Sequence, residues 1–121
     1  MSKFVLRTVP SGIKFDLRAT NGQVIATSEV YDSKAACLNG VKSVKKNAVT
    51  QKIEDQTIGV CKALTNPKFQ IYADKAGLFR FRLTARNGQI IAISEGYTSK
   101  AACENGIASV QQNAPEAEIE E

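Results

Sequence analysis

The sequence of 121 residues contains no histidine and no tryptophan. Without histidine, the chain lacks the most common general base, the most common zinc ligand, and any serine–histidine or cysteine–histidine nucleophile pair. No apolar run approaches the roughly 20 residues that a membrane-spanning helix needs. The first residues, Met1 to Phe4, do not form a signal-peptide pattern. We therefore expect a cytoplasmic protein that uses no histidine-dependent chemistry and has no contact with a membrane.

Cysteine is also scarce: Cys37, Cys61 and Cys103 form no C-x-x-C pair. A zinc site would need a fourth ligand and closer spacing, so we predict reduced thiols and neither a metal nor a cofactor. Cys37 and Cys103 fall on apolar stripes and are predicted to be small buried hydrophobes. Cys61 lies outside any repeated segment, and we expect it to be the most exposed of the three, open to adventitious oxidation rather than used in catalysis.

The composition is that of one soluble globular domain. Hydrophobic residues make up 43% and charged residues 23% of the chain, which is too apolar for a disordered protein. The formal net charge is +4. That is mildly basic, and short of what a dedicated nucleic-acid-binding protein carries.

The most informative feature is an internal duplication. A shift of 66 positions places residues 14–48 on residues 80–114 with 22 identities in 35 gapless positions. The match extends outward, so that repeat 1 covers residues 3–55, a connector covers 56–67, and repeat 2 covers 68–121. We interpret residues 1–121 as a single pseudo-symmetric domain, because one repeat alone would have a thin core.

Each repeat begins with strand patterns. Short strands are predicted at Phe4–Arg7 and Phe69–Tyr72. Next, Asn21-Gly22 and its copy at 87–88 separate two alternating runs, which predicts a two-residue hairpin with a type I′ turn. In that register Ala19 faces Val24 and Leu17 faces Ala26, all on the core face of the sheet.

After each hairpin the hydrophobic period becomes helical. Ser33 and Ser99 are predicted N-caps of helices of about 13 residues that end near Asn47 and its copy at 113. Gly40, at the centre of the first apolar stripe, costs about 1 kcal/mol relative to alanine. We therefore expect the helix to lie very close to the sheet. The repeats end in short segments, 51–54 and 117–120, predicted to be edge or exchanged strands.

The repeated NGQxIxxSExYxSK…NGxxSVxxNA pattern resembles that of the tandem-repeat YegP-like proteins, a bacterial family of unknown function. The resemblance implies an α+β fold in which two β3-αβ repeats form one shared antiparallel sheet, with both helices on one face and the C-terminal strands swapped. It also implies that single-repeat relatives make this assembly as dimers. The cysteines at 37 and 103 and the long connector depart from the pattern. The family supplies no catalytic or binding residues to carry over.

The hairpin face opposite the predicted helices is the first candidate interaction surface. With both helices on one side, arginines and exposed aliphatic residues would share an open sheet face that suits a protein partner or a single-stranded nucleic acid. No aromatic residue falls on this face of the hairpins, which weakens the hypothesis of nucleic-acid binding, because unpaired bases normally stack on aromatic side chains. A solvated face with pairs such as Glu29 and Lys14 is the plain alternative. The candidate residues are Lys14, Arg18, Ile25, Arg80, Arg82, Arg86, Ile91 and Ile93.

A second basic patch lies at the end of the first helix. Lys42, Lys45 and Lys46 are clustered there, whereas repeat 2 has uncharged residues at the three matching positions. Lysines in a last helical turn also favour the negative end of the helix dipole, and this is the simpler interpretation.

No catalytic constellation is recognisable in the sequence. Glu29 with Tyr31, and their copies in repeat 2, stand between strand and helix, but nothing brings the two glutamates together, and pairing with Lys34 and Lys100 is the simpler expectation. We therefore predict a monomeric, non-enzymatic protein that acts through its surface on a protein partner. Weak nucleic-acid binding is the alternative, and an enzyme the third hypothesis.

Overall fold

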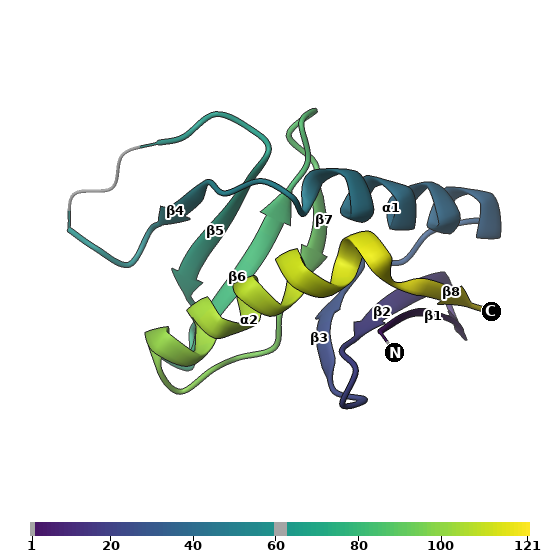
Figure 1. Cartoon of the computed structure of the whole chain (residues 1–121), viewed down its shortest axis with the longest axis horizontal. Helices are drawn as coiled ribbons and strands as arrows, with labels where there is room; N and C mark the ends of the chain where they lie inside the picture. Colours follow the sequence, from purple (N-terminus) through teal and green to yellow (C-terminus); the bar gives the residue numbers. More distant parts are fainter. Residues whose placement is uncertain (1, 60–62) are drawn as a thin grey trace.

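A computed structural model describes residues 2–59 and 63–121, so Cys61 lies outside the described residues. It contains one eight-stranded sheet and two helices (Figure 1). None of the helices in these two ranges is long and apolar enough to cross a membrane. In chain order the elements are β1 (Lys3–Val9), β2 (Gly12–Arg18), β3 (Val24–Thr27), α1 (Lys34–Asn47), β4 (Ile53–Asp55), β5 (Lys68–Ala73), β6 (Phe79–Thr84), β7 (Ile90–Ile93), α2 (Lys100–Asn113), a 3₁₀ turn (Ala114–Glu116) and β8 (Glu118–Glu120).

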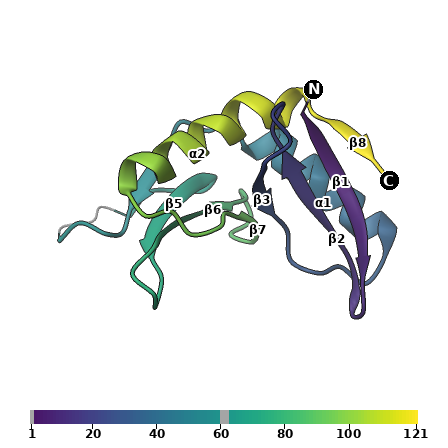
Figure 2. The same cartoon turned by 90° about the horizontal axis from the view of Figure 1, so that it is seen from below.

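The sheet joins the two repeats edge to edge in the order β4-β5-β6-β7-β3-β2-β1-β8. Strands β1 to β3 and β5 to β7 form two antiparallel meanders. They meet at a seam where a single residue pair, Thr27 with Ile93, joins β3 to β7. The two halves of the sheet are inclined to each other at this seam (Figure 2).

The terminal strand of each repeat pairs with the other repeat. β4 lies parallel to β5, and β8 lies parallel to β1. The swap expected from the family resemblance is therefore present within one chain. The sheet is mixed rather than wholly antiparallel, because each swapped strand arrives from a helix that has already crossed the sheet, and so it runs alongside its neighbour in the same direction.

Both helices begin where the sequence predicts. The hydroxyls of Ser33 and Ser99 accept hydrogen bonds of 3.1 Å from the main-chain N–H groups of Ala36 and Ala102. Each helix has 14 residues and ends at an asparagine, Asn47 or Asn113. The serines satisfy one of the unpaired first-turn N–H groups, which fixes the start of each helix.

The two helical glycines permit the predicted close approach to the sheet. A Cβ atom on Gly106 would lie 2.5 Å from the hydroxyl of Tyr97 and 2.9 Å from the Phe81 ring, and Gly40 is as crowded by Tyr31 and Phe15. Each tyrosine ring stacks on the neighbouring phenylalanine ring, with centroids 6.3 Å apart in both repeats. Glycine is required at these positions because the tyrosine occupies the space that a side chain would need.

The hairpin turns differ from the predicted two-residue turns. Gly22 has φ of +85°, but no non-glycine residue among those described has a positive φ, so Asn21 cannot adopt a type I′ turn. Instead, the Gly22 N–H donates to the Ala19 carbonyl and the Ala19 N–H donates to the Gln23 carbonyl, which makes a three-residue loop. Such loops combine an ordinary turn with one left-handed residue, here glycine.

The added loop residue is compensated by a bulge one step down the strand. Arg18 pairs with Val24 and Leu17 with Ala26, so that Ile25 is the extra residue in β3. The predicted Leu17–Ala26 pair is confirmed, and the predicted Ala19–Val24 pair is wrong. The same shift occurs in repeat 2 between Leu83 and Thr84.

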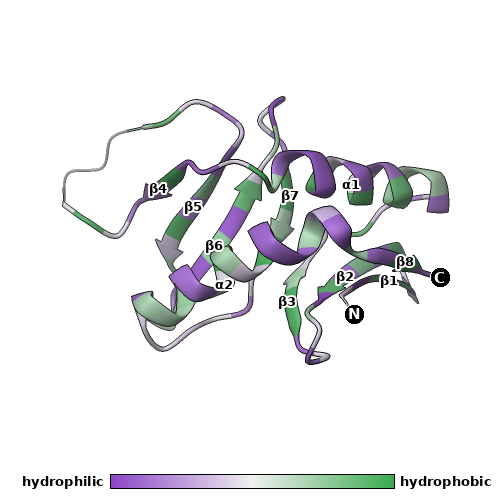
Figure 3. Cartoon of the chain, in the orientation of Figure 1, coloured by the Kyte–Doolittle hydropathy of each residue, from purple (hydrophilic) through white to green (hydrophobic). Residues whose placement is uncertain are grey.

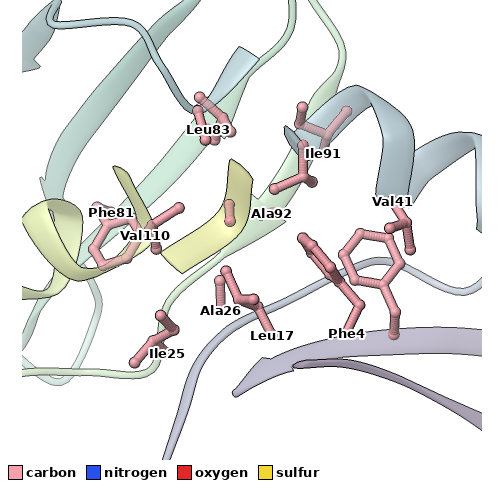
Figure 4. Packing of buried hydrophobic residues seen from close by; sticks show 14 of the residues in the cluster. Phe4, Leu17, Ile25, Ala26, Val41, Phe81, Leu83, Ile91, Ala92 and Val110 are labelled. Atoms are coloured by element: carbon pink, nitrogen blue, oxygen red, sulfur yellow. The ribbon is translucent and has the colours of Figure 1, made fainter. Parts of the chain in front are cut away.

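One core spans the seam. Figure 4 shows Leu17 and Ala26 of repeat 1 close to Ala92 of repeat 2, with Val110 of α2 on one side and Val41 of α1 on the other. α1 contacts β2 of its own repeat and β6 and β7 of the other, while α2 contacts β6 and also β3. Each helix therefore packs across the seam, and neither repeat has a core of its own.

Candidate functional site

The face of the sheet opposite the helices carries a network of paired polar groups. In repeat 1, Arg7 Nε lies 2.8 Å from Asp16 Oδ2, and the hydroxyl of Thr27 donates to Asp16 Oδ1 at 2.8 Å. Asp16 is buried although it belongs to the open face, because these two partners cover it. Repeat 1 therefore presents a charge pair here rather than a free cation.

Two of the three candidate arginines of repeat 2, Arg80 and Arg82, are also engaged. Arg80 donates from Nε to Asp74 at 2.7 Å and from Nη1 to the Ser94 carbonyl at 3.0 Å. This contact, together with the main-chain N–H groups of Leu78 and Ala76, lowers the pKa of Asp74. Arg80 thus joins the turn that contains Asp74 to Ser94 at the end of β7.

Arg82 lies over an aromatic ring that the sequence analysis did not place on this face. Its guanidinium carbon is 4.7 Å from the centroid of Tyr72, and its Nε donates to Gln70 Oε1 at 2.7 Å. Tyr72 belongs to β5, outside the two hairpins for which no aromatic residue was expected, so the sheet as a whole carries an aromatic residue on this face although the hairpins do not. The pair is a cation–π contact that holds Arg82 in place.

The outermost part of this face contains a buried carboxylate, Glu54 of β4. Lys68 Nζ lies 2.7 Å from Glu54 Oε1, the main-chain N–H of Leu64 donates to the same oxygen, and the amides of Gln56 and Gln70 donate to the other. These contacts, that of Lys68 above all, lower the pKa of Glu54 from 4.5 to about 2. The group is ionised at neutral pH, where it anchors the swapped strand, and it does not fit the role of a catalytic acid, which needs a raised pKa.

Two of the predicted exposed aliphatic residues are buried. Ile25 and Ile91 are only 7% and 5% exposed, because the bulge places each of them on the helix side, next to the alanine that follows. The exposed aliphatic residues of the hairpins are instead Val24, at 36%, and Ile90, at 39%. Ile93 faces the open side as predicted and is half-buried beside the seam.

A groove follows the seam on the open face. It has a volume of about 480 Å³, and its lining includes Lys14, Val24, Thr27 and Ile93, with the Arg7–Asp16 pair and Arg80 at its sides. Lys14 has no carboxylate within 4.0 Å among residues 2–59 and 63–121. Three of the sequence-predicted residues, Lys14, Arg80 and Ile93, are thus brought together, whereas Arg18 and Arg82 lie outside the groove.

Arg86 lies on the helix side and not on the open face. It belongs to the three-residue loop of the β6–β7 hairpin and lines a second groove, of about 310 Å³, with Lys42 and Lys46 of α1. Lys45 points elsewhere: its Nζ donates to the Ala117 carbonyl at 2.7 Å, which ties α1 to the segment before β8. Arg86 therefore belongs with the lysines of the second basic patch and not with the residues of the open face, and Lys45 leaves that patch.

A family model for a domain of unknown function, DUF1508, matches residues 12–55 and 74–121, one match in each repeat. The chain belongs to the DUF1508 family. The resemblance to YegP-like proteins is thereby confirmed, and so is the absence of an established function for the family.

DUF1508 relatives occur in one-repeat and two-repeat lengths. A UPF0339 protein in the ptx operon 5′ region of Stutzerimonas stutzeri is 39% identical over 108 residues, which cover 89% of this chain and 84% of the relative. A UPF0339 protein of Methanosarcina acetivorans is 60% identical over 52 residues, only 43% of this chain but 90% of the relative. The solution structure of yegP from E. coli, a protein of unknown function, has a TM-score of 0.80 and 30% identity, covering 98% of this chain and 90% of that one.

The glutamates of the glutamate–tyrosine positions do not form the ion pairs expected from the sequence. Glu29 and Glu95 are exposed. Lys34 and Lys100, expected to pair with them, instead form ion pairs with Glu121 and Asp55 of the swapped strands. Burial raises the pKa of Cys37, and that of Cys103 to about 11, which confirms that both are buried thiols held in the neutral form at pH 7.

The ion pairs that hold the swapped strands were not predicted from the sequence. Lys3 and Lys34 bind Glu120 and Glu121 of repeat 2, and the copies of these lysines in repeat 2 bind the matching carboxylates of repeat 1. A signal existed: both lysines and both acidic residues recur at the same positions in the two repeats.

Proposed function

We propose that this protein is a non-enzymatic cytoplasmic binding protein that acts as a monomer and holds an extended segment of a partner polypeptide in its seam groove. The observation that carries the proposal is the seam itself. Two four-residue strands, β3 and β7, meet through one residue pair, and a groove of about 480 Å³ lies above them on a face that no helix covers.

The chemistry of the groove favours a polypeptide with apolar and acidic side chains. Val24 and Ile93 offer apolar contact, and Lys14 offers a cation with no described carboxylate within 4.0 Å, while Glu95 lines another part of the same groove. An extended strand can also hydrogen-bond along strand edges that the sheet leaves unpaired. A partner segment with alternating apolar and acidic residues matches both features.

Nucleic-acid binding has less support on this face than the sequence indicated. Arg7 and Arg80 are joined to Asp16 and Asp74, and Arg82 is held by Gln70 and Tyr72. Phosphate contacts would have to compete with these partners. Of the three described cations that line the groove, Arg7, Lys14 and Arg80, only Lys14 has no carboxylate partner. One cation is a small footprint for a polyanion, whose affinity depends on the number of phosphates neutralised.

The experiment selects peptides from a random library against the full chain and compares two variants. Ile93→Asp places a charge in the groove, whereas Val49→Asp makes the same kind of change at a residue that is 61% exposed and is not part of the groove. We expect enriched peptides with alternating apolar and acidic residues that bind the wild type and Val49→Asp equally. They should lose at least tenfold in affinity for Ile93→Asp.

The variant Lys14→Glu tests the electrostatic contribution to binding. It should weaken the binding of acidic peptides and leave the binding of purely apolar peptides unchanged. A library that yields no binder, or binders insensitive to both groove variants, would overturn the proposal. Thermal unfolding of each variant shows whether a loss of binding comes from unfolding.

A further inference from the structure

The groove between α1 and the β6–β7 hairpin collects three cations from two repeats. Lys42 and Lys46 come from the last turns of α1, and Arg86 comes from the hairpin loop opposite. All three side chains are exposed, and none has a carboxylate within 4.0 Å among the residues that the structure describes. The hydrophilic C-terminal turns of α1 lie beside this hairpin in Figure 3.

Uncharged hydrogen-bonding groups continue the groove away from the cations. A second hollow of about 310 Å³ shares Asn39, Ser43 and Asn87 with the first and adds Gln89 and Tyr31. From Asn39 to Lys46 the helix rises about 10 Å. A row of amides that can both donate and accept hydrogen bonds therefore runs beside three positive charges.

The pseudo-symmetry provides an internal comparison. In the other repeat in each case, the positions that match Lys42, Lys46 and Arg86 are Ala108, Gln112 and Thr20, all uncharged. The matching helix α2 has the same length of 14 residues as α1 without a basic residue in its last turn, so the helix does not require these cations. Their concentration at one of the two pseudo-symmetric positions points to a ligand bound at one site.

We propose that this groove binds the phosphate backbone of a single-stranded nucleic acid, with Lys42, Lys46 and Arg86 on phosphates and the neighbouring amides on the bases. An enclosed pocket would suit a small anion, since small-ligand sites bury most of their ligand. Here the cations are exposed along an open groove, as in proteins that bind the backbone of a polyanion through several weak charge contacts. This site is separate from the seam groove and does not depend on the proposed peptide binding.

The test measures fluorescence anisotropy of labelled dT12 and rU12 with the full chain between 25 and 150 mM salt. Neutralising three phosphates of a single strand predicts a slope of about −2 for log K against log salt. The double variant Lys42→Ala/Lys46→Gln, which copies the residues of repeat 2, should bind at least fivefold more weakly with a shallower slope. Adding Arg86→Thr should abolish the remaining binding.

Two designs separate a site from general attraction to a basic protein. Arg18→Thr/Lys75→Gln removes the same charge from exposed residues outside the groove and should leave affinity within twofold of the wild type. Ala108→Lys/Gln112→Lys/Thr20→Arg rebuilds the cations in the matching groove and should raise the stoichiometry from one strand to two.

Four results would overturn the proposal. They are no binding at 25 mM salt, an equal loss in the Arg18→Thr/Lys75→Gln control, equal binding of polyglutamate, and binding of a single mononucleotide as tight as that of the 12-mer. The last two would assign the groove to an acidic polypeptide or to a small phosphorylated ligand.

Discussion

At the scale of single residues, the helical glycines show how a local cost supports the packing of the molecule. Glycine inside a helix is unfavourable by about 1 kcal/mol relative to alanine. Its presence at the same place in both helices predicted a close approach, and the tyrosine hydroxyls that crowd Gly40 and Gly106 confirm it. The sequence could not name the tyrosines as the neighbours, because they precede the helices and reach them only through the fold.

The first prediction concerns Gly106→Ala. Helix propensity alone would stabilise this variant, but the new Cβ would lie 2.5 Å from the Tyr97 hydroxyl. Overpacking of this kind costs about 1–3 kcal/mol, so we expect a net decrease in the free energy of unfolding in urea. Adding Tyr97→Phe removes the nearest atom and should recover part of the loss. Gly59→Ala, at a position with no described atom within 4 Å, should be nearly neutral. A stabilised Gly106→Ala would contradict the packing.

A second residue-scale prediction compares Glu54 with its copy, Glu120. Each pairs with a lysine of the other repeat, but the side chain of Glu54 is 4% exposed and that of Glu120 is 53% exposed. Glu54→Gln should lower the free energy of unfolding at pH 7 by about 2 kcal/mol, since it removes charged hydrogen bonds from a buried site. Glu120→Gln should cost no more than about 0.5 kcal/mol.

The pH dependence follows from the lowered pKa of Glu54. Its pKa of about 2 in the folded chain lies below the ordinary 4.5, so the stabilisation is complete above the ordinary value and is lost as the pH falls toward 2. The difference between wild type and Glu54→Gln in urea unfolding should therefore shrink across that window. A difference that stays constant from pH 7 to pH 2 would show that the carboxylate charge is not the cause.

At the scale of elements, the hairpin shows how a one-residue change in a turn alters the exposed face. The Asn-Gly pair predicted a hairpin at the right place, and the structure has one. The turn holds three residues instead of two, and a bulge restores the register by Leu17, so that Ile25 is turned inward. Local sequence could not distinguish the two turns, because both use glycine with positive φ.

Substitution at adjacent hairpin positions tests this register. Ile25→Asp should destabilise the protein by about 3 kcal/mol or more, because it buries an unpaired charge at a residue that is 7% exposed. Val24→Asp, at a residue that is 36% exposed, should cost less than about 1 kcal/mol. The two-residue turn predicts the opposite order, so the two thermal unfolding curves distinguish the two registers.

At the scale of the whole molecule, each repeat completes the other. The swapped strands β4 and β8, the ion pairs that hold them, and helices that cross the seam all join repeat 1 to repeat 2. A relative of M. acetivorans that matches this chain over 90% of its own length has room for only one repeat. The same contacts between two copies would satisfy such a chain.

We expect a fragment of residues 1–58 to fold only as a dimer. Its β4 would pair with β1 of a second copy, with Glu54 facing Lys3 as Glu120 does in the intact chain. Size-exclusion chromatography with light scattering should give two copies for the fragment and one for the full chain. A folded monomeric fragment would show that one repeat has a sufficient core, and a dimeric full chain would contradict the proposed monomer.

The sequence by itself determined the duplication, the strand and helix positions, the serine caps and the small-residue stripes, because each depends on contacts between neighbouring positions. Tertiary structure decided which groups the surface offers. It paired Arg7 and Arg80 with carboxylates, turned Ile25 inward, and carried Arg86 across to Lys42 and Lys46. These outcomes join residues from different strands and different repeats, and a periodic pattern does not specify how far a turn shifts one strand against the next or which side chains then meet.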